Sequence, residues 1–244
     1  VEGAKELIEL GANSAKPLKR SVAFDADLSS FYKIHLMARL PFRFLRQISD
    51  FECNGADSLY HQTKRAFDWA LWLPPSLSFR VDVSGFSYGL THSHFSALQV
   101  KNSIIDLQRE VWGKRSNVDL HVPDICIHLH LGGGKAYLSL ATSANSLHKR
   151  GYRSALGIAP LKENVAAGLI RLTDWKSSIP LIDPLCGSGT FLLEGASMAM
   201  GLIPRLHKSF LFEKWPDFDF DLFKKVQKSV GNIPSIDEKK ITII

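Results

Sequence analysis

The segment best able to carry chemistry is a glycine-containing loop between a short apolar strand and an apolar helix. The loop spans residues 183–190 and reads DPLCGSGT, with the strand expected at 179–182 and the helix at 191–200. Glycines in such a loop let the backbone turn tightly and approach a ligand beside the helix N-terminus. The loop is therefore the first candidate for a ligand-binding site.

Four ligand or catalytic signatures of similar geometry match this loop only in part. A phosphate-binding loop needs lysine after its last glycine, but Thr190 follows Gly189. A dinucleotide fingerprint starting at Gly187 places Leu192 where its third glycine belongs. A nucleophile elbow centred on Ser188 lacks both flanking glycines, and a papain-like cysteine signature matches only three positions. Two interpretations remain: a turn without a ligand, or an S-adenosylmethionine loop whose acid faces the ligand's charged groups.

Three arginines upstream form the second candidate. The apolar spacing predicts a helix over 30–48, capped by one of two serines at its start and kinked or divided at Pro41. Arg39, Arg43 and Arg46 would then lie along one helix face. That face is either a row of phosphate contacts or a solvated basic surface.

The remaining pattern alternates between helices and strands. Residues 125–131 alternate apolar with smaller or polar side chains, which is typical of a half-buried strand, and glycines at 132–134 supply the turn to its partner. A strand, a glycine loop and helices in that order indicate the first half of a doubly wound parallel sheet. Further helices are expected at 1–10, 57–72, 94–112, 160–172 and within 213–228, and strands at 78–83, 136–141 and 241–244.

Composition indicates a folded chain with a modest positive charge. Of 244 residues 45% are hydrophobic and 22% charged, which argues against a disordered tail, and the net charge of +6 permits a polyanionic partner. No stretch approaches the roughly 18 apolar residues of a membrane span. Three scattered cysteines and no CxxC favour a reducing, cytoplasmic location. The histidine pairs 92/94 and 128/130 lack neighbouring ligands, so no metal site is expected.

Four stretches carry a resemblance to a known family. They are residues 38–40 (ARL), 146–153 (SLHKRGYR), 159–163 (APLKE) and 183–190. With these stretches in this order, the chain resembles the THUMP-containing RNA guanine-N2 methyltransferases, most closely the bacterial members that act on large-subunit (23S) rRNA. The resemblance implies an α/β and α+β chain: an incomplete ferredoxin-like part (1–55), a THUMP RNA-binding domain (56–142) and the start of a class I, Rossmann-like methyltransferase domain (143–244).

The resemblance also implies roles for individual residues. The basic turn suits RNA, because arginine and lysine hold phosphates and a tyrosine offers a face to an unstacked base. The alternative is that Tyr152 is a packing anchor and the basic residues coat a linker. The adenosylmethionine pocket would be lined by Asp183, Pro184, Cys186, Gly187, Gly189 and Thr190, with Pro160, Leu161 and Glu163 as its other wall. RNA would contact Lys149, Arg150, Tyr152, Arg153, Arg39 and Arg43.

One expected motif is missing. The family methylates an exocyclic amine with an (Asn/Asp)-Pro-Pro-(Tyr/Phe) loop, whereas the one Pro-Pro pair here, Pro74 and Pro75, follows Leu73 and lies upstream of the glycine loop. We therefore expect a truncated chain that holds no catalytic residue and does not transfer a methyl group by itself. The alternatives are an RNA-binding THUMP module with a non-catalytic methyltransferase remnant, or an amino-methylating DNA enzyme. The sequence predicts no oligomeric state.

Overall fold

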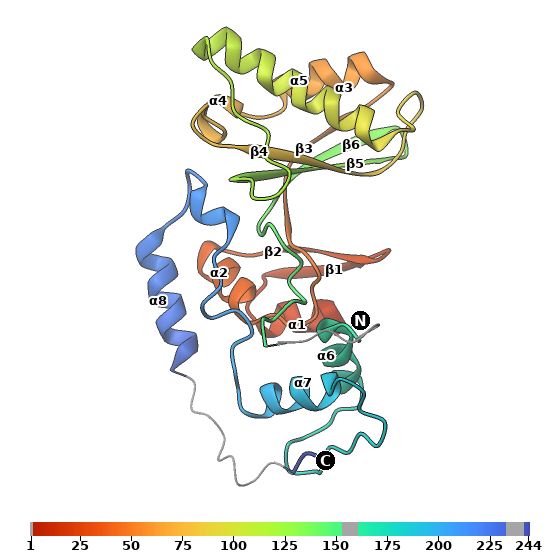
Figure 1. Cartoon of the computed structure of the whole chain (residues 1–244), viewed down its shortest axis with the longest axis vertical. Coiled ribbons are helices and arrows are strands. Elements are labelled where there is room, and N and C mark those ends of the chain that lie inside the picture. The colour runs from red at the N-terminus through yellow and green to blue at the C-terminus, as the bar shows by residue number, and fades with distance from the viewer. Residues whose placement is uncertain (1, 153–160, 233–241) are drawn as a thin grey trace. The chain divides into compact units, whose positions relative to one another are not determined.

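The computed structural model describes residues 2–152, 161–232 and 242–244, which form two compact units (Figure 1). The first unit contains Val1–Phe42, Asn145–Lys208 and Asp219–Ile244, and the second contains Arg43–Ala144 and Ser209–Phe218. These boundaries differ from the expected ranges 1–55, 56–142 and 143–244. The second unit begins at Arg43 and includes the short segment Ser209–Phe218.

The second unit is built on a four-stranded sheet. Its strands are β3 (Leu45–Glu52), β4 (Phe79–Gly85), β5 (Ile125–Gly132) and β6 (Lys135–Ala141), in the order β3-β6-β5-β4. Strands β4 and β5 are parallel, and the other pairs are antiparallel. The strand predicted over 125–131 is confirmed, but the prediction that it is half-buried is wrong. Cys126 and His128 are buried as well as the isoleucines and leucines, and of these residues only His130 is exposed.

Helices cover one face of this sheet. Helices α3 (Ala56–Arg65) and α5 (Ser93–Trp112) lie together over it, as Figure 1 shows. The expected helix 57–72 is divided, because α3 ends at Arg65 and Asp68 caps a separate short helix, α4 (Trp69–Trp72). A turn of 3-10 helix, η1 (Leu211–Lys214), contacts β5 and packs Leu211 beside Cys126 and Ala141.

The first unit begins with α1 (Glu2–Glu9), the hairpin β1 (Ser14–Leu18) and β2 (Ser21–Asp25), and helix α2 (Leu28–Met37). Sequence reasoning missed the hairpin. The helix expected over 30–48 is wrong beyond Met37, because Ala38 is extended and β3 follows. Its cap is the Asp27 carboxylate, which accepts the Ser30 amide, rather than a serine.

The remaining helices of this unit are α6 (Glu163–Leu172), α7 (Thr190–Ala199) and α8 (Phe220–Gly231). Helix α6 packs on α7, and α8 packs on α2, where the rings of Tyr32 and Phe223 meet edge to face at 5.2 Å. Of the two strands expected at 179–182 and 241–244, the described residues form a single parallel bridge between Leu181 and Ile243. The helix expected within the charged segment 213–228 is confirmed as α8, which follows the end of η1.

The chain passes between the units along hydrogen-bonded segments. Within the first unit the Leu147 amide donates to the Phe42 carbonyl at 2.9 Å. Within the second unit the Thr142 amide donates to the Phe44 carbonyl at 3.2 Å. Among the described residues, no helix is both long and apolar enough to span a bilayer.

Candidate functional site

The glycine loop begins after a parallel bridge and ends at the first residue of a helix. The Asp183 amide donates to the Ile244 carbonyl at 2.9 Å, directly after the bridge at Leu181. The half-buried Asp183 carboxylate accepts the Leu185 amide at 3.3 Å, and α7 starts at Thr190. Ligands bind at the carboxyl ends of parallel strands in open α/β sheets, so the loop has the expected setting of a binding site.

Two glycines keep the loop backbone open. Gly187 and Gly189 have φ angles of 52° and 70°, in the left-handed region that favours glycine. Apart from its chain neighbours, no atom of the described residues lies within 4 Å of a methyl group added at either glycine. The Gly189 amide closes the turn by donating to the Cys186 carbonyl at 2.8 Å, while Pro184 and Cys186 are exposed. The described residues therefore leave space beside the loop backbone at both glycines.

The segment expected as the opposite wall lies beside the loop. The Thr190 hydroxyl donates to the Leu161 carbonyl at 3.5 Å, which joins the start of α7 to the residues before α6. Glu163, the first residue of α6, is buried. The structure thus brings Leu161 and Thr190 together. Pro160 lies outside the described residues.

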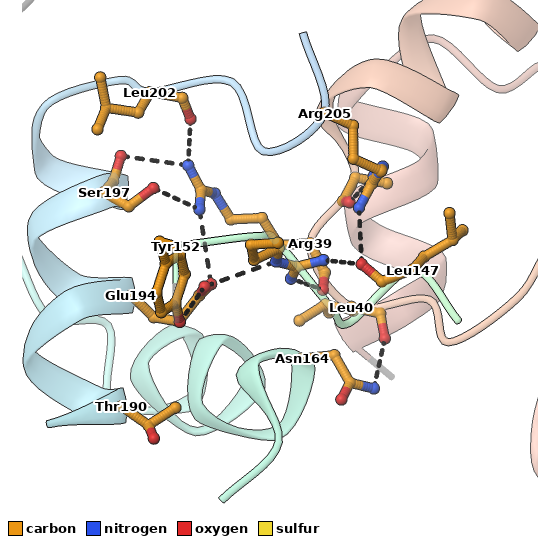
Figure 2. A network of polar contacts seen from close by, with 12 residues as sticks. Arg39, Leu40, Leu147, Tyr152, Asn164, Thr190, Glu194, Ser197, Leu202 and Arg205 are labelled. Carbon is orange, nitrogen blue, oxygen red and sulfur yellow. Dashed lines mark hydrogen bonds and ion pairs between the residues drawn. The ribbon is translucent and has the colours of Figure 1, made fainter. Parts of the chain in front are cut away.

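Two arginines expected to contact RNA are buried instead. The side chains of Arg39 and Arg150 are 11% and 3% exposed, and both approach the fully buried carboxylate of Glu194. Figure 2 shows the approach of Arg39. Nη1 of Arg39 lies 3.6 Å from Oε2 of Glu194, and Nε of Arg150 lies 3.5 Å from Oε1. The expected RNA contacts through Arg39 and Arg150 are therefore corrected, because guanidinium groups enclosed in this way do not face a phosphate.

The expected row of arginines on one helix face is wrong for a local reason. Glu6 accepts the backbone amides of Arg39 and Leu40 at 2.8 and 3.0 Å. This buried carboxylate holds the chain in an extended path after α2, and burial raises the pKa of Glu6. Arg43 then lies in an exposed connection, and Arg46 lies on β3, where it pairs with Asp217 at 2.5 Å.

Sequence reasoning missed two residues of this cluster. Glu194 is the one acid in the otherwise apolar segment 190–200, and that isolation was the available signal. Arg205 is buried and donates to the carbonyls of His35 (2.6 Å), Leu147 (3.5 Å) and Ala38. Burial lowers the pKa of Arg205 to about 9. Nothing in the sequence around Arg205 indicated a buried residue.

The remaining residues of the basic turn differ in accessibility. Lys149 is exposed, and the Tyr152 side chain is partly exposed while its hydroxyl donates to Oε1 of Glu194 at 3.1 Å. Arg153 lies outside the described residues. Lys149 and Arg43 are thus the two described basic residues of the expected RNA set that face solvent.

His128 and His130, one of the two histidine pairs, have the same hydroxyl neighbour. On β4 and β5 the Ser84 hydroxyl lies 3.2 Å from Nε2 of His128 and 3.0 Å from Nδ1 of His130. Burial lowers the pKa of His128 to about 4. Within the described part of the chain, no group of three His, Cys, Asp or Glu side chains is arranged to hold a metal ion.

Two family models match the chain in succession. Residues 53–141 match the THUMP domain, and residues 150–240 match the RMKL-like methyltransferase domain. The chain therefore carries a THUMP domain followed by methyltransferase-domain sequence. This order confirms the resemblance to the THUMP-containing RNA methyltransferases.

Curated relatives extend the same result. The chain is 44% identical over 221 residues to the Synechocystis protein named "Putative RNA methyltransferase slr0064", a match that covers 90% of this chain and 57% of that protein. It is 37% identical over 231 residues to "Ribosomal RNA large subunit methyltransferase K/L" of Vibrio campbellii, covering 94% of this chain and 32% of that protein. The chain thus spans from about a third to somewhat over half of these relatives.

Solved structures confirm the fold class. A Listeria monocytogenes protein described as a predicted N6-adenine-specific DNA methylase superposes with a TM-score of 0.85 at 26% identity, covering 99% of this chain and 63% of that one. The protein SMU.472, described as a putative methyltransferase complexed with SAH, superposes with a TM-score of 0.84 at 28% identity. The match covers 98% of this chain and 63% of that one. The fold is therefore the mixed α/β fold of methyltransferases that carry a THUMP region.

Proposed function

We propose that this chain is the RNA-binding and cofactor-binding part of an adenosylmethionine-dependent methyltransferase that modifies the exocyclic amine of guanine in 23S rRNA. The activity is proposed for the whole protein, since the chain spans only part of its relatives. The domain order supports an RNA substrate, and the name of the Vibrio relative supports large-subunit rRNA.

One observation carries the cofactor assignment. The loop 183–190 leaves a parallel bridge, turns through two left-handed glycines with open space beside them, and leads into α7. The SAH complex of SMU.472, which shares this fold, supports the same ligand class for this chain. A turn without a ligand would give no reason for two glycines, one on each side of Ser188, that hold left-handed conformations beside space that the described residues leave open.

The residues present fit adenosylmethionine. The carboxylate of Asp183 suits a ligand that carries a sulfonium and an amino group, and the backbone at Gly187 and Gly189 accommodates its methionine portion. Leu161 and Glu163 would form the opposite wall. Bound adenosylmethionine supplies an electrophilic methyl group, and the chain's own contribution is to bind and orient it.

The experiment that tests the proposal separates binding from transfer. Calorimetry on the 244-residue chain should detect S-adenosylhomocysteine binding, and a filter assay should detect binding to a 23S rRNA fragment in preference to duplex DNA. With the protein expressed from its complete coding sequence and radiolabelled adenosylmethionine, nucleoside analysis should identify N2-methylguanosine. A methylated adenine or a preference for DNA would contradict the proposed substrate.

A second candidate is an RNA-binding module whose methyltransferase part is not catalytic. The observation that favours it is the position of Pro74 and Pro75, which follow α4 in the second unit and not the glycine loop in the first. We expect the 244 residues alone to bind the cofactor without transferring its methyl group. Transfer by the protein from the complete coding sequence would exclude this second candidate.

A further inference from the structure

The short segment Arg39–Leu40 lies against elements from three parts of the first unit. Its two backbone amides donate to the Glu6 carboxylate of α1. The Leu40 carbonyl accepts a hydrogen bond from Nδ2 of Asn164, in the first turn of α6, at 3.2 Å. The segment is therefore fixed to the helix whose first residue, Glu163, is part of the 161–163 wall.

The Arg39 side chain reaches the helix that begins at the glycine loop. Its guanidinium donates to the Ser197 hydroxyl at 3.0 Å, to the Ser197 carbonyl at 3.2 Å and to the Leu202 carbonyl (Figure 2). It also pairs with Glu194, one helical turn after Thr190. The backbone of one short segment thus holds α6, while its side chain holds α7.

Glu194 is the anion on which this arrangement depends. Its carboxylate is fully buried and is approached by Arg39 and Arg150 and by the Tyr152 hydroxyl. Arg150 also donates to the carbonyls of Leu147 (2.7 Å) and Arg39 (2.5 Å). Removing the negative charge would leave two buried guanidinium groups without their anion, which is the costly way to break a buried ion pair.

We propose that Arg39 and Glu194 are positioning residues for the adenosylmethionine site. By tying α6 and α7 to the same segment, the pair fixes the spacing between the 161–163 wall and the loop 183–190 and so sets cofactor affinity. Binding energy is lost when groups that must contact one ligand are held apart by even small displacements. This inference rests on the proposed function and goes beyond it, because neither residue belongs to the loop or to its opposite wall.

The test uses the protein from its complete coding sequence and compares two ion pairs in the same unit. Arg39→Lys and Glu194→Gln are paired with Arg171→Lys and Glu9→Gln, which alter a more exposed pair at 2.9 Å between α6 and α1. Calorimetry measures the Kd for S-adenosylhomocysteine well below each variant's melting temperature. Amide hydrogen exchange across residues 183–190 measures local opening of the loop, and filter binding measures affinity for a 23S rRNA fragment.

The expected result is a rise of about tenfold or more in the Kd for Glu194→Gln, as for loss of a group that pre-organises a site. Arg39→Lys should raise the Kd less, with faster exchange in the loop and unchanged RNA affinity in both. The Arg171 and Glu9 variants should leave the Kd unchanged. A Kd equal to wild type with only a lower melting temperature would show a purely structural role and overturn the inference.

Milder variants keep the test decisive if Glu194→Gln fails to fold. Ser197→Ala removes one acceptor of the Arg39 guanidinium, and Tyr152→Phe removes one donor to Glu194. Each should raise the Kd by a few-fold, and unchanged affinity in both overturns the inference. Weaker RNA binding by Arg39→Lys with unchanged cofactor affinity also overturns it. Absence of binding by the wild-type protein would contradict the proposed function itself.

Discussion

The Tyr152 hydroxyl donates a hydrogen bond to Oε1 of Glu194 at 3.1 Å, although the tyrosine side chain is partly exposed and the carboxylate is fully buried. The tyrosine is thus joined to the helix that follows the glycine loop. Of the two interpretations the sequence left open for Tyr152, this contact favours the packing anchor.

Tyr152→Phe isolates that hydrogen bond, because the ring is retained. We expect the free energy of unfolding to fall by about 1–3 kcal/mol, as for a buried charged acceptor that loses a donor. Urea unfolding measures the change. RNA affinity should be unaltered, and a marked loss of RNA binding would instead indicate that the hydroxyl contacts the nucleic acid.

Gly189→Ala tests the cofactor loop. A Cβ at φ 70° is strained and fills space beside the loop backbone, so we expect at least a tenfold rise in the Kd for S-adenosylhomocysteine. Gly134→Ala is the matched control, since Gly134 has φ 74°, equally open surroundings and a place in the β5–β6 turn. If both variants lost S-adenosylhomocysteine binding equally, the loss would reflect general destabilisation and not a change at the cofactor loop.

Gly85→Ala should destabilise the second unit. A Cβ at Gly85 would lie 2.0 Å from the Leu131 carbonyl oxygen, and φ is 74°. The left-handed conformation alone costs about 1–2 kcal/mol, and the backbone clash adds to it. Gly113→Ala should show the conformational cost alone, because φ is 61° and no atom of the described residues, chain neighbours apart, lies within 4 Å of the added Cβ. Similar unfolding midpoints for the two variants would contradict the close approach of the Gly85 backbone to the Leu131 carbonyl.

Stability should decrease in acid partly through His128. Its ordinary pKa is 6.5 and burial lowers it to about 4 in the folded chain, so the unfolded state binds more protons between these values. The free energy of unfolding should therefore fall as pH drops from 6.5 to 4, by about 3 kcal/mol at most from this group. His128→Gln should flatten that slope without removing it, because burial also lowers the pKa of His35, to about 3. If the free energy of unfolding of His128→Gln depended on pH as steeply as that of wild type, His128 would not be a source of the acid sensitivity.

Lys149→Ala and Arg43→Ala should weaken RNA binding. Both side chains are exposed, and loss of one phosphate contact reduces the slope of log affinity against log salt by about 1. Lys5→Ala serves as the control, since Lys5 is exposed on α1 and pairs with Glu2. If the dependence of RNA affinity on salt were the same as in wild type, Lys149 and Arg43 would not contact RNA phosphates.

Local patterns predicted the elements whose signals are local. Strand β5, the glycine loop and the start of α7 follow from residues adjacent in sequence. The helix expected over 30–48 was wrong because Glu6, more than 30 residues upstream, accepts the amides of Arg39 and Leu40. A distant carboxylate leaves no signal in the segment it reshapes.

The candidate site was predicted in part for the same reason. The loop 183–190 was recognised from residues adjacent in sequence. Arg39 was assigned to RNA from a helix face that does not form, and Arg150 from the family resemblance of the basic turn. Their burial depends on Glu194, which lies in a helix far along the chain. Only the fold brings these three side chains together.

The pairing of Phe42 with Leu147, and of Phe44 with Thr142, constrains how this protein can be altered by insertion or deletion. Between the two bonds one segment has a single residue, Arg43, and the other has four, 143–146. An engineer who exchanged residues 43–144 for a related module would have to choose cut points that let both hydrogen bonds form again, and would have to exchange residues 209–218 with them.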